Sequence, residues 1–426
     1  MSRVAVVGAG WAGCAAAVQA ATENHEVTVF EATRVPGGRA RSILAPDRGA
    51  GPSGLDNGQH ILIGAYSATL DLMTRVSVDI TRSISRLPLS LSFPDGTGLR
   101  LPGWAGPLAP LLGILLARGW NLADKSSLLR AAWRWRRSGF ECAPRQTVED
   151  ICLGLNAAVR RDLIDPLCVS ALNTPAAEAS GRAFLRILRD SLFGPRGSSD
   201  LLLPCTDLSN LLPIPALDWL LQRGGQVRLG HRVESIARQG AAWVVDGESF
   251  DALLLATPPW ESARLVEQSG APAGAWLDAV HALRYEAITT VYLAGQARLA
   301  QPMLALRSGP GAPAQFVFDR GQLGGPEGLL AFVVSASHGS REELQEQVLH
   351  QAHAELGLAD LQTVQTIVEK RATFACVPGL QRPRQTILPG LLACGDYVEG
   401  PYPSTLEGAV RSGLEAARQI SGPTSA

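Results

Sequence analysis

Two short apolar runs at the start of the chain enclose a stretch of small residues. Arg3–Val7 and Glu26–Phe30 have the length and side chains of β-strands, and Trp11–Ala21 has those of a helix packed closely on a sheet. A strand, a helix and a second strand in this order predict a βαβ unit with parallel strands. The second run is followed by Glu31, which places a carboxylate at the end of its strand.

The pattern changes between residues 77 and 215, where proline and glycine are frequent. Two helical segments stand out in this region, Ser126–Arg137 and Ala157–Leu172. We expect an inserted domain here, because β-type runs return only at Gln226–Ile236 and Trp243–Thr257. The second of these runs ends in a pair of prolines, which stops a strand.

The last third of the chain again mixes strands and helices. Thr290–Ala375 contains strands and one charged helix, Ser340–Leu356, and suggests more sheet of the inserted domain. Gly390–Ile420 predicts a strand, a loop and a helix. We therefore expect segments from the middle and the end of the chain to complete the first domain.

One apolar stretch, Leu101–Trp120, has about the length of a membrane span. Pro102, Pro107 and Pro110 interrupt its first half, so no continuous helix can satisfy its backbone across a bilayer. The intact run, Leu111–Ala117, is about two helical turns long. With tryptophan and arginine on its flanks, it suits a helix that dips into one leaflet. It suits a core helix lining an apolar pocket equally well.

Composition narrows the class of protein. A chain of 426 residues exceeds what one hydrophobic core organises, which predicts two domains or one with large insertions. The formal net charge of -1 lacks the basic excess of nucleic-acid-binding proteins, so we expect no nucleic-acid partner. Seven cysteines without a C-x-x-C pair predict reduced thiols in a cytoplasmic protein. The first strand begins at Arg3, where a signal peptide would need a basic and then an apolar region.

The first motif with a chemical meaning lies between the first strand and the first helix. Gly8, Gly10 and Gly13 have G-x-G-x-x-G spacing, which gives a tight turn, a bare backbone against a pyrophosphate and close helix packing. Glu31 follows roughly 20 residues on, where a carboxylate can bind ribose hydroxyls. The pattern predicts a dinucleotide site at the N-terminus of the helix. The expected contacts are Gly8, Ala9, Gly10, Trp11, Ala12, Gly13, Glu31 and Ala32.

A second glycine turn follows the ribose-binding strand. Gly37 and Gly38 precede Arg39 and Arg41, which supply bare backbone and positive charge for another part of a long dinucleotide. The run from Glu31 through Gly-Gly-Arg to a serine resembles the FAD-dependent amine oxidase and phytoene desaturase superfamily. The resemblance implies FAD, with Gly38 and Arg39 near the pyrophosphate.

The C-terminal run LLACGDYVEGPYPSTLEGAVRSG resembles the second FAD motif of that superfamily. A carboxylate at the end of its strand can hold a ribitol hydroxyl, and the following helix N-terminus can stabilise negative charge on reduced flavin. The motifs at the two ends of the chain then share one ligand. The implied contacts are Gly395, Asp396, Ser404, Thr405, Leu406, Glu407 and Ala409. Val233, in an expected strand, occupies the position of a backbone contact to adenine.

A third block, LDNGQHILIGAY, places Asp56, Asn57, Gln59 and His60 on a strand-like stretch near the expected flavin ring. Together with PLCVSALNTPAAEAS and PSTLEGAVRSG it resembles squalene-associated FAD-dependent desaturase proteins, whose characterised activity is hydroxysqualene dehydroxylation. This likeness covers essentially the full chain, and it adds Gln59 and His60 to the expected FAD contacts. The turn Asn173–Pro175 is also typical of an ordinary helix C-terminus.

These observations predict an α/β fold with a Rossmann-type, glutathione-reductase-like FAD-binding domain and an interwoven α+β substrate domain. The FAD-binding domain is expected to comprise residues 1–76, 216–262 and 385–426. The substrate domain is expected to comprise residues 77–215 and 263–384, with membrane contact in residues 101–137.

The narrower resemblance implies an oxidoreductase of isoprenoid lipid metabolism that reduces hydroxysqualene to squalene for squalene and hopanoid biosynthesis. We hypothesise that an acid protonates the allylic hydroxyl, that water leaves, and that reduced FAD delivers a hydride. An acid in an apolar pocket would have a raised carboxyl pKa. Asp56 and His60 are the candidates, and Tyr402 is the candidate cation-stabilising ring. The implied partners are an apolar isoprenoid substrate, an unidentified electron donor and the cytoplasmic membrane leaflet, with peripheral attachment.

Other functions remain open or are disfavoured. A carotenoid (phytoene-type) desaturase would use the flavin in the opposite direction, and a prenyl-lipid escort protein would not need its redox chemistry. Amine oxidation is disfavoured because Lys125 and Lys370 are the only lysines, both in charged settings. His350 and His353 lack accompanying carboxylates or cysteines, so we expect no metal site.

Overall fold

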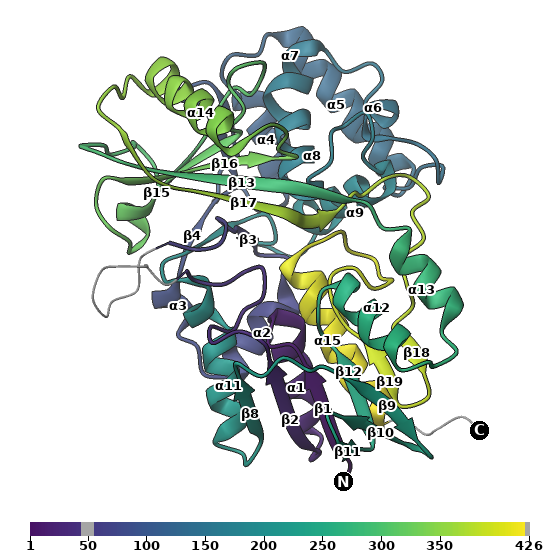
Figure 1. Cartoon of the computed structure of the whole chain (residues 1–426). Helices are drawn as coiled ribbons and strands as arrows, with labels where there is room; N and C mark the ends of the chain where they lie inside the picture. The colour runs from purple at the N-terminus through teal and green to yellow at the C-terminus, as the bar shows by residue number, and fades with distance from the viewer. Residues whose placement is uncertain (44–54, 422–426) are drawn as a thin grey trace.

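The computed structural model describes residues 1–43 and 55–421. Figure 1 shows two parts, with both chain termini in the lower one. The lower part contains a six-stranded sheet in which neighbouring strands are parallel, except for an antiparallel pair at one edge. In spatial order its strands are β18 (Thr386–Leu388), β19 (Leu391–Ala393), β12 (Ala252–Leu255), β1 (Arg3–Val7), β2 (Glu26–Glu31) and β8 (Gln226–Leu229).

Alternating side chains give this sheet two buried faces. Val4 and Val6 of β1 pack on the helical side, whereas Ala5 and Val7 pack on the other. The helical side holds α1 (Trp11–Thr22), α2 (Ser67–Arg75), α11 (Pro213–Leu221) and α15 (Leu406–Ser421). The other side holds an antiparallel sheet of β9 (Ile236–Gln239), β10 (Ala242–Val245) and β11 (Glu248–Phe250).

The first and last helices pack directly on each other. A Cβ atom at Gly413 of α15 would lie only 2.1 Å from the carbonyl oxygen of Ala12 in α1. Only glycine allows this approach, and the alanine-rich sequence of α1 keeps the opposing surface small. The two ends of the chain are therefore built into one layer, as Figure 1 shows.

The upper part contains a five-stranded antiparallel sheet. Val291 and Leu293 face α14 (Arg341–Leu356), whereas Tyr292 between them faces the opposite core. In spatial order the strands are β14 (Met303–Ala305), β15 (Phe316–Asp319), β16 (Leu329–Ser335), β13 (Tyr285–Ala294) and β17 (Gln362–Phe374).

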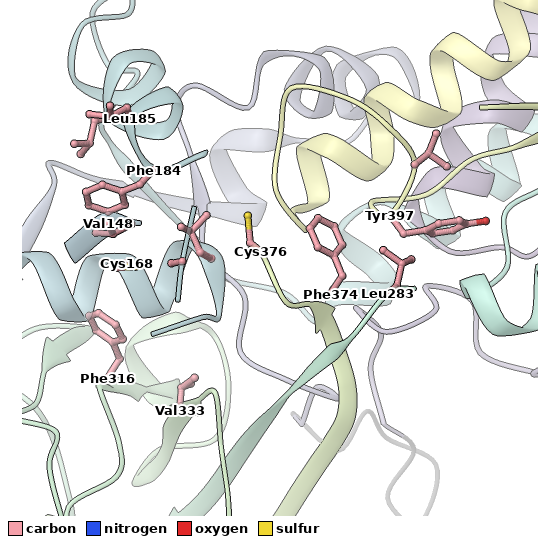
Figure 2. Close-up of a cluster of buried hydrophobic side chains, with 14 of the residues drawn as sticks. Val148, Cys168, Phe184, Leu185, Leu283, Phe316, Val333, Phe374, Cys376 and Tyr397 are labelled. Carbon is pink, nitrogen blue, oxygen red and sulfur yellow. The ribbon is translucent and has the colours of Figure 1, made fainter. Parts of the chain in front are cut away.

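A layer of helices covers the face of this sheet opposite α14. Figure 2 shows the contact, with Val148 and Phe184 of the helical layer above Phe316 and Val333 of the sheet. The helices are α4 (Ala109–Leu116), α5 (Leu122–Arg137), α6 (Val148–Ile151), α7 (Ala157–Val159), the π-helical turn η2 (Arg160–Ile164), α8 (Asp165–Leu172) and α9 (Gly181–Leu192).

Shorter elements connect the two parts. A small antiparallel sheet lies between them, and a hairpin packs on β14 and α4 of the upper part. These elements are β3 (Leu62–Ile63), β4 (Ile84–Leu87) and β7 (Leu201–Pro204), and β5 (Ser90–Ser92) and β6 (Gly98–Arg100). The remaining elements are α3 (Ile80–Ser83), η1 (Gly106–Leu108), α10 (Leu208–Leu211), α12 (Pro259–Gln268), α13 (Gly274–His281) and η3 (Arg320–Leu323).

The predicted α/β fold with a Rossmann-type domain is confirmed, as are the N-terminal βαβ unit and the strand, loop and helix at the C-terminus. Two local predictions are wrong. Val233 is not on a strand, because β8 ends at Leu229 and Asp246 accepts hydrogen bonds from the backbone of Glu234 and Ser235. Residues 57–61 also lack regular secondary structure. The exact domain boundaries remain a prediction.

Candidate active site

A cavity of about 770 Å³ lies between the two parts of the molecule. At one end its wall consists of the glycine-rich loops after β1 and β2 and the start of α15. At the other end the wall is mostly apolar and comes from α4, α5, α8 and α9 and the upper sheet. Polar groups therefore gather at one end of a mostly apolar chamber.

The two glycine loops form one continuous backbone surface. The Gly37 N–H donates to the carbonyl of Ala9 over 2.9 Å, and a Cβ atom at Gly38 would lie 3.3 Å from the Cα of Gly10. In the described structure α1 begins without a side-chain cap or an acidic residue in its first turn. Its N-terminal N–H groups and its dipole can therefore bind a phosphate.

Glu31 lies at the edge of the cavity where the sequence places a ribose-binding carboxylate. Its side chain accepts hydrogen bonds from the Ala9 N–H at 2.7 Å and from the Thr33 N–H and hydroxyl at 2.8 Å. These donors hold the carboxylate in place beside the first glycine turn.

The N-terminal and C-terminal motifs meet in an ion pair. The Arg39 guanidinium lies 2.5 Å from a carboxylate oxygen of Asp396, although the two residues are 357 positions apart. Arg39 also donates to the carbonyl of Ala372 at 2.5 Å, and the Ser404 hydroxyl donates to Asp396. This arrangement fixes the start of α15 against the second glycine loop.

These groups fit FAD. The bare glycine backbone and the uncapped helix N-terminus can bind the pyrophosphate, Glu31 can bind a ribose, and Asp396 can bind the ribitol. Most of the expected contact residues line the cavity. They are Gly8, Gly10, Trp11, Ala12, Glu31, Ala32, Gly38, Arg39, Gln59, His60, Val233, Gly395, Asp396, Ser404, Thr405, Leu406 and Ala409. Ala9, Gly13 and Glu407 are not part of its wall.

The structure gives Glu407 a different role from the expected cofactor contact. Its fully buried carboxylate accepts hydrogen bonds from the backbone N–H groups of Ala68 and Thr69 and from the Thr69 hydroxyl. Arg411 pairs with it at 2.7 Å. Glu407 therefore binds α15 to the N-terminus of α2, where a negative charge is favourable.

Asp56 does not line the cavity, contrary to the position expected of an acid that contacts substrate. Its carboxylate accepts a hydrogen bond from the Leu208 N–H at 2.9 Å and lies 3.8 Å from the Arg320 guanidinium, which is also buried. Burial raises the pKa of Asp56 to about 6, although the Leu208 hydrogen bond and Arg320 oppose the rise. The carboxylate anchors the loop that carries Asn57, Gln59 and His60.

This raised pKa predicts a pH dependence of stability. The folded state binds the Asp56 proton more tightly than the unfolded chain does. The stabilisation that this proton gives the folded state is therefore present at low pH and is lost as the pH rises through about 6. Relative to Asp56→Asn, the wild-type free energy of unfolding should fall by about 2 kcal/mol between pH 4.5 and 7.5. Urea denaturation at both pH values measures the difference, with the exposed Asp218→Asn as control. An equal pH response of wild type and Asp56→Asn would contradict the expectation.

His60 lines the cavity, and its ring is bonded to its own loop. Nδ1 lies 3.0 Å from the carbonyl oxygen of Gly58, which can only accept, so Nδ1 carries a proton. Burial lowers the pKa of His60, and nearby Arg39 lowers it further. The neutral ring has an unprotonated Nε2, and the protonated ring is a stronger acid than free histidine.

Tyr402 lines the cavity, and two arginines lie close to its ring. The guanidinium carbons of Arg186 and Arg411 are 5.4 and 5.3 Å from its ring centre. The expected cation-stabilising ring therefore already has two cationic neighbours. This arrangement argues against Tyr402 as the ring that would stabilise a substrate cation.

Two further wall residues were not singled out from the sequence. Trp260 follows the proline pair after β12 and packs with Tyr285 edge to face at 5.5 Å, while Arg371 lies over its ring at 4.6 Å. Tyr66 precedes α2 and also lines the cavity. Only the Pro-Pro-Trp sequence after the strand gave a signal for Trp260, and Tyr66 was marked only as the last residue of the block LDNGQHILIGAY.

Asn173 forms the expected helix C-terminus and also lines the cavity. It adopts a left-handed conformation with φ of 47°. Its side chain donates to the Thr373 hydroxyl at 2.9 Å and accepts from the Ala336 N–H at 2.5 Å. Asn173 thereby joins α8 to β17 and to the end of β16, the two strands that flank β13.

The fold and the site define a flavoprotein oxidoreductase. The family model "Flavin containing amine oxidoreductase" matches residues 11–421, and the chain belongs to this family. It is an FAD-dependent oxidoreductase.

Comparison with known proteins identifies relatives along the whole chain. The chain is 27% identical to a hydroxysqualene dehydroxylase of Zymomonas mobilis over 98% of each protein. It is 28% identical to one of Rhodopseudomonas palustris over 97% of each. A zeta-carotene desaturase of Synechocystis matches only 17% of this chain. A putrescine oxidase structure covers 98% of both chains at 17% identity with a TM-score of 0.70.

Proposed function

We propose that this protein is a hydroxysqualene dehydroxylase, which reduces hydroxysqualene to squalene. The observation that carries the proposal is a continuous cavity that joins the FAD-binding loops to an apolar chamber. The full-length likeness to two hydroxysqualene dehydroxylases supports this substrate, whereas the desaturase match is confined to a short segment.

The apolar walls suit a long hydrocarbon with one hydroxyl group. Leu128 and Trp135 of α5, Leu163 and Leu167 near α8 and Ile187 of α9 line this end of the cavity. Burying a chain in such a chamber contributes roughly 25 cal/mol per Å² of apolar surface. The walls therefore bind the hydrocarbon and exclude water, and the polar end receives the carbon that carries the hydroxyl.

In the proposed reaction the C–O bond breaks, the hydroxyl leaves as water after accepting a proton, and a hydride forms the new C–H bond. FAD supplies this hydride when it is bound in its reduced form, and an external donor replaces the two electrons. His60 donates the proton to the leaving hydroxyl from Nε2, and the Gly58 carbonyl keeps its ring oriented.

The test uses the purified holoprotein, reduced with dithionite under anaerobic conditions and supplied with hydroxysqualene in detergent. We expect squalene, identified by gas chromatography and mass spectrometry, in an amount stoichiometric with the reduced flavin. A parallel reaction gives the oxidised protein phytoene in air. Desaturated phytoene without squalene would support a carotenoid desaturase instead, and a protein that binds no flavin would support an escort protein.

The role of His60 predicts a pH profile. The lowered pKa leaves little protonated His60 at pH 7.5, so the single-turnover rate should rise as the pH falls to 5.5. His60→Gln should retain FAD, lose about 10²-fold in rate and lose this dependence. Asp56→Asn should retain the pH dependence of the single-turnover rate. If that variant lost this pH dependence, Asp56 would be the acid instead of His60. Full turnover by His60→Gln would exclude His60 as the acid.

A further inference from the structure

We propose that the outer face of α4 and α5 docks on a membrane leaflet that contains anionic lipid, and that the isoprenoid enters the cavity through this face. The entry route rests on the proposed function, whereas the docking surface does not. Figure 1 shows α4 and α5 in the upper part of the molecule, away from both chain termini. The apolar residues of this face are Trp104, Leu108, Leu111, Leu115, Leu116, Leu122 and Trp133, here called the apolar patch.

Exposed large hydrophobic side chains concentrate in this patch. Fourteen such side chains are exposed in the described part of the chain, and seven of them lie between residues 104 and 133. Leu122 is 85% exposed, Trp104 76%, and Leu116 and Trp133 63% each. A cluster of this kind marks an interaction surface, because isolated exposed hydrophobic residues are common but clusters are not.

The patch is suited to entering one leaflet. Among the described residues, no helix is long and apolar enough to cross a bilayer. The eight residues of α4 span about 12 Å at 1.5 Å per residue, less than half of a hydrocarbon core of about 30 Å. Leucines on a short helix with tryptophans at its margins are typical of helices that lie in the interface.

Each helix of this face has a second apolar side that lines the cavity. Pro110 and Ile114 of α4 contribute to the cavity wall, whereas Leu111 and Leu115 are exposed. In α5, Trp135 lines the cavity while Trp133 is exposed. The barrier between the patch and the chamber is therefore one helix thick, so an apolar substrate can pass from lipid to cavity with little exposure to water.

Charges around the patch favour lipid over a protein partner. Residues 100–141 contain seven basic residues and two carboxylates, and one of these, Asp124, is buried in a helix cap. The chain as a whole has a formal charge of -1, so this excess is local. Each basic residue near an anionic surface contributes about 1 kcal/mol of attraction. A second copy of the chain on this face would bring the like charges together.

The basic residues are placed beside the apolar ones. Arg118, Arg130, Arg134, Arg136 and Arg137 are exposed, and the Arg137 guanidinium lies 5.3 Å from the centre of the Trp133 ring. Lys125 donates to the carbonyl of Leu115 at 2.8 Å, which ties the start of α5 to the end of α4. Apolar insertion and headgroup attraction thus act at the same surface.

The test is flotation of the holoprotein with vesicles of phosphatidylcholine alone or with about one third phosphatidylglycerol. We expect binding to the anionic vesicles that weakens with salt, and a blue shift of tryptophan fluorescence. Leu115→Glu/Leu116→Glu should reduce binding at least about tenfold. The matched control Leu221→Glu/Val364→Glu, which changes exposed residues elsewhere, should bind like wild type. Equal flotation of the patch variant and wild type, or no binding to either vesicle, would overturn the proposal.

Two further measurements distinguish a membrane-docking surface from a subunit interface and test the entry route of the substrate. If sedimentation shows a wild-type dimer that the patch variant lacks, the patch is a subunit interface and the proposal is wrong. With hydroxysqualene in detergent, the patch variant should turn over like wild type, and with hydroxysqualene in vesicles it should be at least about tenfold slower. If the wild-type protein floats with the vesicles but forms no squalene under any condition, the proposed function is refuted and the docking surface is not.

Discussion

Arg39→Met is expected to purify with less than about one tenth of the bound FAD of the wild-type protein. Methionine keeps much of the side-chain volume but removes the partner of Asp396, whose carboxylate is then left buried beside the site. A fully buried unpaired charge costs 3–5 kcal/mol. The Arg39 side chain is 31% exposed, so we expect a loss of roughly 2 kcal/mol in the free energy of unfolding.

A double-mutant cycle with Asp396→Asn isolates the ion pair. The double variant should be less destabilised than the sum of the two single variants, because neither charge remains unpaired. Arg82→Met is the control, since its ion pair with Asp79 lies at the surface. Flavin content is measured by absorbance after denaturation, and stability by urea titration. Additive effects, or full flavin content in Arg39→Met, would show that the two motifs do not act together.

Gly8→Ala should also yield protein without flavin. Gly8 has φ of +108°, and a Cβ atom would lie 2.7 Å from the carbonyl oxygen of Ala256 in the neighbouring loop. Both the backbone conformation and the contact disfavour alanine, which predicts a loss of about 3 kcal/mol in stability. The turn would also shift, and the N–H groups at the start of α1 would no longer be aligned.

Gly274→Ala provides the comparison for this variant. Gly274 has no positive φ, and nothing lies within 4 Å of its potential Cβ position. It should therefore retain wild-type stability and flavin content. Wild-type flavin content in Gly8→Ala, measured on folded protein by circular dichroism and absorbance, would contradict the assignment of this turn to the pyrophosphate.

The parts of the site that could be predicted from sequence depend on local chemistry. Gly8, Gly10 and Glu31 lie on one strand-helix-strand unit, so their spacing alone determines how they meet. The position of Asp396 could be predicted in the same way, because it follows shortly after strand β19. The proximity of Arg39 and Asp396 followed from the assignment of both residues to the same FAD molecule.

The mistaken assignments involve partners that are distant in the sequence. Asp56 was expected in the pocket, but Arg320 lies 264 positions away and no local pattern indicates that it is buried beside Asp56. Glu407 belongs to a cofactor motif, yet its carboxylate binds Thr69, which is 338 positions away. The two arginines around Tyr402 come from α9 and α15. Such contacts arise from tertiary packing, which hydrophobic periodicity does not encode.

The direct packing of α1 on α15 has a consequence for biosynthesis. The N-terminal βαβ unit is synthesised well before α15, so the layer that supports it is finished only when α15 (Leu406–Ser421) has been translated. Its exposed apolar surface must therefore be protected while the segments between α1 and α15 are translated. A chain that ends before α15 lacks this layer, and we expect that it does not bind the cofactor.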